Sequence, residues 1–166
     1  MEITTANVII MSDENGEKPL QDYLEILAET ALNSHVDKVK YLFIMKALEY
    51  LATVPKKILP SNNSVEETPT TTTLEVKVDK QTYSQTFRLV KALRRSPIFE
   101  LRLSIANFNW HFRIIFFPKY HENKLYYCLT FPFEKRKSDV DPTDEFRDRA
   151  YDIFKSLQTQ GTQFNP

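Results

Sequence analysis

Residues 97–137 read PIFELRLSIANFNWHFRIIFFPKYHENKLYYCLTFPFEKRK, and this stretch decides the fold. Apolar residues alternate with other residues over 99–104, 109–117 and 125–133, which is the period of β-strands. The segment 120–124 has the composition of a tight turn between the second and third of these strands. We therefore predict three consecutive antiparallel strands at the centre of the protein.

The alternation divides the strand side chains between two faces of a sheet. One face is almost entirely apolar, and we expect it to cover the helices. Its side chains are Phe99, Leu101, Leu103, Trp110, Phe112, Ile114, Phe116, Leu125, Tyr127, Leu129 and Phe131. The other face mixes polar and aromatic residues, and we expect it to be open. Its side chains are Glu100, Arg102, His111, Arg113, Ile115, Phe117, Tyr126, Cys128 and Thr130.

Two arginines lie on the face that we expect to be open, Arg102 in the first strand and Arg113 in the second. A strand in a sheet rarely carries a cation unless water or a ligand reaches it. Three further cations, Lys135–Lys137, follow the third strand directly. Because arginine binds phosphate through paired N–H donors, the pattern predicts a sheet face that holds phosphate. The structural alternative is that the arginines pair with Glu100 or lie on a solvated face.

The charge is unevenly distributed along the chain, although the 22 Lys and Arg balance the 22 Asp and Glu. Residues 86–137 hold 11 basic and 3 acidic residues, a net charge of +8. The flanking segments are acidic, with net charges of −3 for 1–60, −2 for 61–85 and −3 for 138–166. A basic middle of this kind indicates a polyanion or an acidic partner, and an ordinary solvated surface remains the alternative.

The flanking sequence predicts the other elements. We expect a strand over 6–12, helices over 19–32 and 36–54, and a last helix from Asp141 to about Leu157, with Asp141 as its N-cap. The fold class is therefore α+β, an antiparallel sheet of about four strands packed on two N-terminal helices, with a C-terminal helix. One domain over 1–158 is expected, followed by a frayed tail over 159–166.

A polar, threonine-rich segment interrupts this pattern. Ser61–Thr73 is expected to be a flexible loop, Leu74–Val78 an edge strand and Tyr83–Ala92 a short helix. Together they form an inserted, flexible segment at about 60–85.

Several classes of protein are disfavoured by composition. Cys128 is the only cysteine, so no intramolecular disulfide forms, and neither a secretory signal nor a membrane-spanning apolar run is visible. The three His and one Cys show no metal-ligand spacing, and two glycines cannot make a glycine-rich phosphate loop. We expect a soluble, cytoplasmic protein without a cofactor and without a membrane partner.

Four stretches together resemble the RelE/ParE toxin superfamily, specifically its HigB-like, often phage-borne branch. VIIMSDENGEKPLQDYLEIL at 8–27 matches an opening strand, an Asn-Gly-x-x-Pro turn and a first helix. VKALRRSPIFELR at 90–102 matches a basic link into a strand that ends Glu-Leu-Arg. FRIIFF at 112–117 matches the Tyr-Arg-Ile strand. CLTFPFEKRKSDVDPTDEFRDRA at 128–150 matches a strand, a Phe, a basic pair and a helix bearing Ala.

The resemblance implies a RelE-like fold and the toxin of a type II toxin–antitoxin system that cleaves mRNA, commonly on the ribosome. Its partners would be RNA or the ribosome and a cognate antitoxin protein. By position, Arg102 falls on the Glu-Leu-Arg arginine and Arg113 on the Tyr-Arg arginine. Lys135 and Arg136 fall on the basic pair, and these family positions contact or cleave RNA.

The chemistry assigns roles to four residues. Metal-independent RNA cleavage must remove a proton from the ribose 2′-OH, stabilise the phosphorane and return a proton to the 5′ oxygen. Arg102 and Arg113 are the candidate phosphate clamps. His111 shares the face of Arg113, and an imidazole can accept or donate a proton, so it is a candidate base or acid, with a structural histidine as the alternative. Lys135 would line the mouth of the cleft.

Further RNA contacts are predicted around the same face. An aromatic side chain there could stack a base, and the cations would bind the backbone. The predicted RNA-binding residues are Arg94, Arg95, Tyr126, Arg136 and Lys137.

Two functions compete at this point. The first is an endoribonuclease toxin. The second is a non-catalytic binder of toxin fold, phage-borne, that inhibits a host nucleic-acid enzyme. Convergence of Arg102, His111, Arg113 and Lys135 on one phosphate-sized site would favour the first, and divergence would favour the second.

Overall fold

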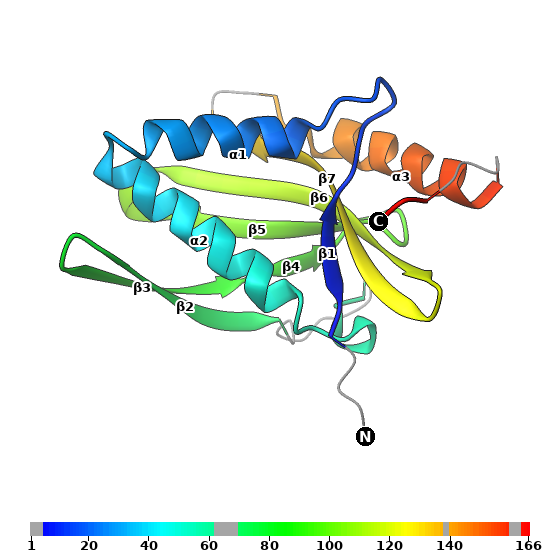
Figure 1. Ribbon diagram of the computed structural model, residues 1–166, viewed down its shortest axis with the longest axis horizontal. Helices are drawn as coiled ribbons and strands as arrows, with labels where there is room; N and C mark the ends of the chain where they lie inside the picture. Colours follow the sequence, from blue (N-terminus) through cyan, green and yellow to red (C-terminus); the bar gives the residue numbers. More distant parts are fainter. Residues whose placement is uncertain (1–4, 62–69, 138–139, 160–163) are drawn as a thin grey trace.

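The computed structural model describes residues 5–61, 70–137, 140–159 and 164–166, which form an α+β fold (Figure 1). Its described strands fall into a five-stranded and a two-stranded sheet. In chain order they are β1 (Asn7–Ile10), β2 (Thr71–Val78), β3 (Gln81–Arg88), β4 (Val90–Ala92), β5 (Phe99–Ile105), β6 (Trp110–His121) and β7 (Lys124–Glu134). The helices are α1 (Pro19–Thr30), α2 (His35–Leu51) and α3 (Thr143–Thr159), with short 3₁₀ turns at Lys56–Ile58 and Ala106–Phe108.

The three predicted central strands are confirmed as β5, β6 and β7, which pair antiparallel in the order of the sequence. Glu122 and Asn123, both with positive φ, make the two-residue turn between β6 and β7. The complete sheet has the order β1-β7-β6-β5-β4. Because β1 pairs parallel to β7, the sheet is mixed. The prediction of an antiparallel sheet of about four strands was therefore wrong in strand direction and in strand number.

One face of the sheet packs against the two N-terminal helices, as expected. Leu20 and Leu27 of α1 and Phe43 of α2 belong to the same buried core as Leu101 and Phe112. Pro19 begins α1, and the Ser34 hydroxyl caps α2 by accepting from the backbone N–H of Asp37, so both helices begin where the sequence signals lie.

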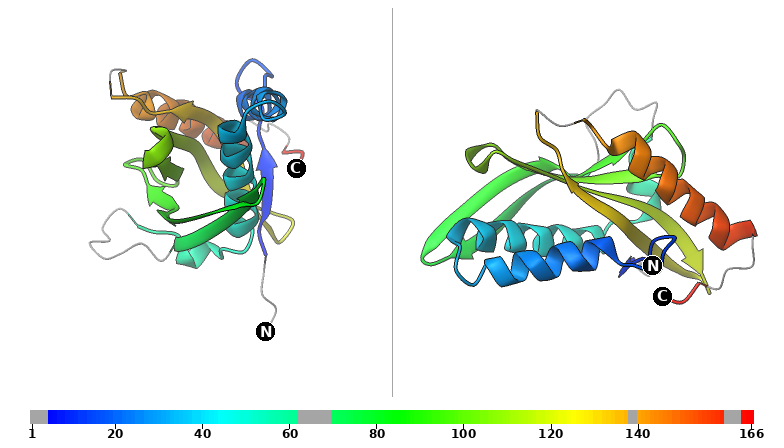
Figure 2. Two further views of the ribbon diagram at one scale, coloured as in Figure 1. Left: turned by 90° about the vertical axis from the view of Figure 1, so that its left-hand side faces the viewer. Right: turned by 90° about the horizontal axis from the view of Figure 1, so that it is seen from above.

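The opposite face was expected to be open, and this prediction was wrong where α3 packs on it. Helix α3 covers it, on the other side of the sheet from α1 and α2 (Figure 2). Ala150 of α3 is fully buried above Ile115, Phe117 and Cys128. The apolar stripe of α3 requires an apolar sheet surface, so only the end of this face near Arg113 remains accessible.

A β-bulge changes the face of β7 midway along the strand. Ile114 pairs with Pro132 and Phe116 with Leu129, so two residues of β7 lie opposite Ile115 alone. The hydroxyl of Thr130 donates to the carbonyl of Ile115 at 2.7 Å and holds the bulge. The bulge moves Phe131 into the core under α3, which corrects its predicted place beside the N-terminal helices.

The inserted segment is largely structured where it is described. The predicted strand Leu74–Val78 is confirmed within β2, but the expected loop ends earlier, because Thr71–Thr73 also belong to β2. The predicted helix over Tyr83–Ala92 was wrong, since that range forms strands β3 and β4. Residues 62–69 of the predicted loop lie outside the described residues. The hairpin packs its apolar side on α2, which supplies the buried partner that the sequence did not show.

The C-terminal tail is also partly ordered against the fold. Residues 160–163 lie outside the described part, but Phe164 is buried against the rings of His121 and Tyr126. The prediction of a frayed tail is therefore wrong at Phe164. No helix in the described ranges is long and apolar enough to cross a membrane.

Candidate functional site

A cleft of about 710 Å³ lies where β6 begins and β7 ends, beside the chain that leads into α3. The backbone N–H of Lys135 donates to the carbonyl of His111 at 2.7 Å and extends the pairing of the two strands to this point. Five basic side chains and two carboxylates line the cleft. They are His111, Arg113, Lys135, Arg136, Lys137, Glu134 and Asp141.

Arg113 lies at the inner wall of this cleft and is 5% exposed. Its Nη1 donates to the carbonyl of Phe112 at 2.9 Å and, at 3.4 Å, to the Leu103 carbonyl and the Ser104 hydroxyl. Burial lowers the pKa of the guanidinium, and the nearby carboxylate of Glu100 opposes that shift. The side chain is thus held in one orientation by the backbone of two strands.

Glu100 connects the two strand arginines. Its Oε1 lies 3.4 Å from Nε of Arg113 and 3.5 Å from Nε of Arg102, and the residue is buried. Burial raises the pKa of the Glu100 carboxyl, while the charges of Arg113 and Arg102 pull it down. The pairing with Glu100 foreseen as the structural alternative is therefore present for both arginines.

The four residues predicted to do the chemistry converge only in part. His111, Arg113 and Lys135 line the one cleft. Arg102 lies opposite Arg113 on β5 but is not among the residues of the cleft wall. Arg102 and the cleft residue Arg113 both pair with the carboxylate of Glu100.

The mouth of the cleft is organised by two acidic residues that sequence reasoning did not assign to the site. Asp141 accepts from the backbone N–H and the hydroxyl of Thr143 and lies 3.1 Å from Nζ of Lys135. The Thr143 hydroxyl has the largest effect and lowers the pKa of Asp141; burial opposes it, and the Thr143 backbone N–H and Lys135 lower the pKa further, to about 2. Asp141 therefore bonds to the first residue of α3, which begins at Thr143 and not at Asp141 as predicted, and it also orients Lys135.

Glu134 is the second of these acidic residues. It accepts from the hydroxyl of Tyr23 at 2.9 Å, from Nε1 of Trp110 at 3.1 Å and from Arg136 at 3.0 Å. Burial alone would raise the pKa of Glu134, but the hydrogen bonds from Tyr23, Arg136 and Trp110 outweigh it and lower that pKa. Glu134 thereby links the exposed Arg136 side chain to Tyr23 of α1 and Trp110 of β6.

The cleft continues into a smaller hollow of about 340 Å³ that reaches α2. Lys40 contributes a further cation there, with its Nζ 5.7 Å from the centre of the Trp110 ring. Lys40 had no sequence signal, because a lysine on an amphipathic helix is ordinarily a solvated residue. His111, Lys135 and Arg136 line both spaces, so the basic surface is continuous between them.

The structure places three of the predicted RNA-binding residues away from the cleft. Arg95 pairs with Asp148 of α3 at 3.1 Å and stacks on the ring of Tyr151. Arg94 is exposed in the link between β4 and β5. Tyr126 lies near the other end of β7, where its ring contacts Phe164. Arg136 and Lys137 are the two that line the cleft.

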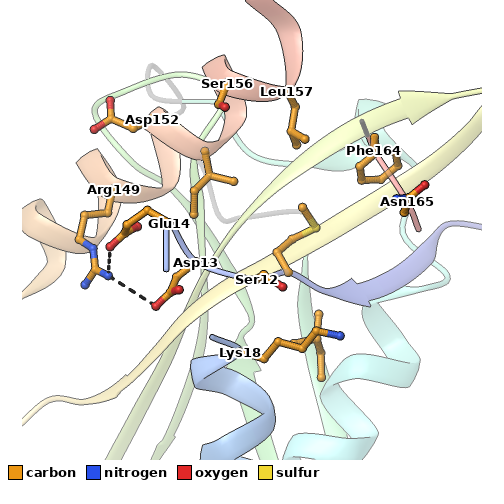
Figure 3. A pocket seen from close by; sticks show the side chains of 13 residues that line it. Ser12, Asp13, Glu14, Lys18, Arg149, Asp152, Ser156, Leu157, Phe164 and Asn165 are labelled. Atoms are coloured by element: carbon orange, nitrogen blue, oxygen red, sulfur yellow. Dashed lines mark hydrogen bonds and ion pairs between the residues drawn. The ribbon is translucent and has the colours of Figure 1, made fainter. Parts of the chain in front are cut away.

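A second cavity, of about 600 Å³, lies between the β1–α1 connection, α3 and the C-terminal residues (Figure 3). Arg149 points from α3 toward Asp13, 3.9 Å away, and also pairs with Glu14. Asp13 in turn accepts from the backbone N–H groups of Asn15 and Glu17. These contacts fasten α3 to the turn before α1, which is a structural role.

Comparisons with known proteins add no relative. No family model, no curated protein and no solved structure matches the chain. Within the described residues, no group of three or more His, Cys, Asp or Glu is arranged to hold a metal ion. The case for a function therefore rests on the residues of the cleft.

Proposed function

We propose that this protein is an RNA-cleaving toxin of the RelE/ParE type, HigB-like, that acts in the cytoplasm as one half of a type II toxin–antitoxin pair. The observation that carries the proposal is the shared cleft: His111, Arg113 and Lys135 line it together with Arg136 and Lys137. An imidazole among four cations is a suitable arrangement for holding and cleaving a phosphodiester.

The arrangement of the chain supports the same proposal. The order of β1, α1, α2, β5, β6, β7 and α3 is the order on which the resemblance to that superfamily rests. The hairpin β2–β3 and the short β4 are additions between the second helix and the central strands. The basic segment 86–137 contributes the cleft, apart from Asp141 and its neighbours.

In the proposed reaction, His111 takes the proton of the ribose 2′-OH, and the 2′ oxygen attacks the phosphorus atom. The bond from phosphorus to the 5′ oxygen breaks, which leaves a 2′,3′-cyclic phosphate and a 5′-hydroxyl. Lys135, oriented by Asp141, returns a proton to the departing 5′ oxygen. Arg136, paired with Glu134, binds the non-bridging oxygens as charge builds up on them.

Arg113 contributes differently from the clamp first expected. Its Nη1 already bonds to two backbone carbonyls and its Nε faces Glu100. A charge held rigidly in a partly dry wall favours an anion nearby without having to reorient, which is how preorganised groups stabilise a transition state. Arg113 therefore acts as a fixed positive wall, while Lys135 and Arg136 make the direct contacts.

One observation favours the second function, a non-catalytic binder that inhibits a host nucleic-acid enzyme. Lys135 pairs with Asp141 and Arg136 with Glu134, so both cations already have carboxylate partners. An acidic protein surface that exchanges with these carboxylates would fit the same cleft.

The two functions are separated by incubating the purified protein with end-labelled RNA in two conditions, in chelator without ribosomes and in magnesium buffer with ribosomes. Cleavage that leaves cyclic phosphate ends is expected for the wild type and is lost in His111→Ala. His121→Ala is the matched control, because His121 lies at the opposite end of β6. Weak RNA binding without cleavage in either condition, together with a tight complex with one host protein in a pull-down, would favour the binder. Absence of RNA cleavage in both conditions would overturn the proposal of a nuclease.

A further inference from the structure

The edge of the β2–β3 hairpin carries an inference that is independent of the cleft. Within the described residues β2 pairs with β3 alone, so the outer edge of its Leu74–Val78 part has no strand partner among those residues. Figure 1 shows β2 at the margin of the molecule, with α2 across one face of the hairpin. The strand is eight residues long and contains neither proline nor a bulge, two of the devices that keep an edge from pairing.

The turn of the hairpin determines which backbone groups face this edge. Asp79 and Lys80 both have positive φ, so they form a two-residue turn of type I′ between Val78 and Gln81. In such a hairpin the residues that flank the turn form a hydrogen-bonded pair, and such pairs recur at every second residue. Val78, Val76 and Leu74 therefore bond to β3, and Glu75 and Lys77 direct their N–H and C=O groups outward.

The side chains of Glu75 and Lys77, whose backbone groups face the free edge, carry opposite charges. Glu75 and Lys77 are exposed, whereas Val76 between them is 3% exposed against the core. If two β2 strands pair antiparallel about a two-fold axis at Val76, Glu75 of each copy lies opposite Lys77 of the other. A shift of the axis by one residue would instead place Glu75 opposite Glu75, or Lys77 opposite Lys77. Cross-strand pairs of opposite charge stabilise a sheet and like charges weaken it.

We propose that two copies of this chain associate through β2, antiparallel and centred on Val76, with Glu75 of each copy opposite Lys77 of its partner. The result is a four-stranded sheet, β3-β2-β2-β3, across the two-fold axis. Both α2 helices cover one of its faces, because opposite residues of an antiparallel pair direct their side chains to the same side. The outer face carries Thr73 and Thr86, which already bond to each other at 2.8 Å within one copy.

A contact made by one strand edge is small compared with the roughly 1,200–2,000 Å² of stable interfaces, so we expect a reversible dimer that depends on concentration. Its charge pairs lie on the solvent side, so high salt should weaken it. The proposal predicts not only a dimer but also which single charge reversals break it and which double reversal restores it.

The test is sedimentation velocity over a range of concentrations for the wild type and three variants of the full chain. Glu75→Lys places Lys opposite Lys twice, Lys77→Glu places Glu opposite Glu twice, and each should weaken the dimer about tenfold from two altered pairs. The variant Glu75→Lys with Lys77→Glu recreates both opposite pairs and should return the dissociation constant to near the wild-type value.

Glu29→Lys is the matched control, because Glu29 is exposed on α1 and the substitution changes the net charge by the same amount as Glu75→Lys. It should leave the dimer unchanged. A monomeric wild type at all concentrations would overturn the proposal. A dimer that neither single reversal weakens would also overturn it, because the interface would then lie elsewhere. A double reversal that fails to restore association would exclude the proposed register.

Discussion

Arg102 and Arg113 lie directly opposite each other on β5 and β6, and one buried carboxylate separates their charges. Like charges at opposite positions of two antiparallel strands weaken a sheet when nothing compensates them. Glu100 supplies the compensation, because its Oε1 lies within 3.5 Å of Nε of both arginines. Arg113 at the inner wall of the cleft therefore belongs to a three-residue charge cluster that depends on its one acidic member, Glu100.

Replacing Glu100 with Gln should destabilise the protein strongly. The substitution keeps the shape of the side chain but leaves Arg113 buried without a counter-charge, and breaking a buried ion pair from one side costs about 3 kcal/mol or more. The free energy of unfolding in urea measures the loss. Arg102→Gln is the control, since Arg102 is half-exposed and Glu100 keeps Arg113, so its loss should be under about 1 kcal/mol. Equal losses in the two variants would contradict this account.

The capping of α3 should show in the pH dependence of stability. The folded pKa of Asp141 is lowered to about 2, below its unfolded value, so its contribution is complete above roughly pH 4 and is lost as the pH falls through 2. In Asp141→Asn that contribution is absent. The difference in stability between the wild type and the variant should therefore be constant at neutral pH and should shrink between about pH 4 and 2. The difference should be small, because Asp141 is half-exposed.

The sequence predicted the central strands because alternation is a local signal, and the same signal failed where geometry breaks its period. Leu129 and Phe131 are two residues apart, so the pattern assigns them to one face. The bulge opposite Ile115 places their side chains on opposite faces of the sheet. In β3, Tyr83 and Phe87 are four residues apart, a spacing that suits one face of a helix and one face of a strand equally. Only the packing of the hairpin on α2 decides between the two.

The cations of the larger cleft could be predicted from the sequence, whereas Lys40 of the smaller hollow and the carboxylates could not. Arg113, Lys135 and Arg136 stood out as charges on or directly after a strand. Glu134 did not, because its donors Tyr23 and Trp110 are distant in the sequence and meet it only in the folded chain. The sequence also could not show that Arg102 lies outside the cleft wall. The alternation places Arg102 on the correct face of the sheet, but it does not show where along that face the cleft lies.

Cys128 should be unreactive in the native protein. The thiol lies under α3, and burial raises its pKa to about 12, so almost no thiolate forms at neutral pH. Mass spectrometry after brief treatment with iodoacetamide should find no modification in buffer and complete modification in denaturant. Ala150→Asp provides a check of the cause, because a carboxylate buried at the centre of α3 should detach the helix and expose the thiol. A thiol that reacts readily in the intact wild type would show that α3 does not stay on the sheet.

The cleft should give RNA binding a definite dependence on salt. If about three phosphates are held, the slope of log K against log salt should be near −2 for a single strand, at about −0.7 per phosphate. Lys135→Ala and Arg136→Ala each remove a cation from the cleft and should each flatten the slope by about 0.7. Lys124→Ala removes an exposed cation at the other end of β7 and should leave the slope unchanged. Fluorescence anisotropy with a labelled oligonucleotide measures all four proteins. A Lys124→Ala slope as flat as that of Lys135→Ala would show that the binding is spread over the basic surface and that the cleft has no special part in it.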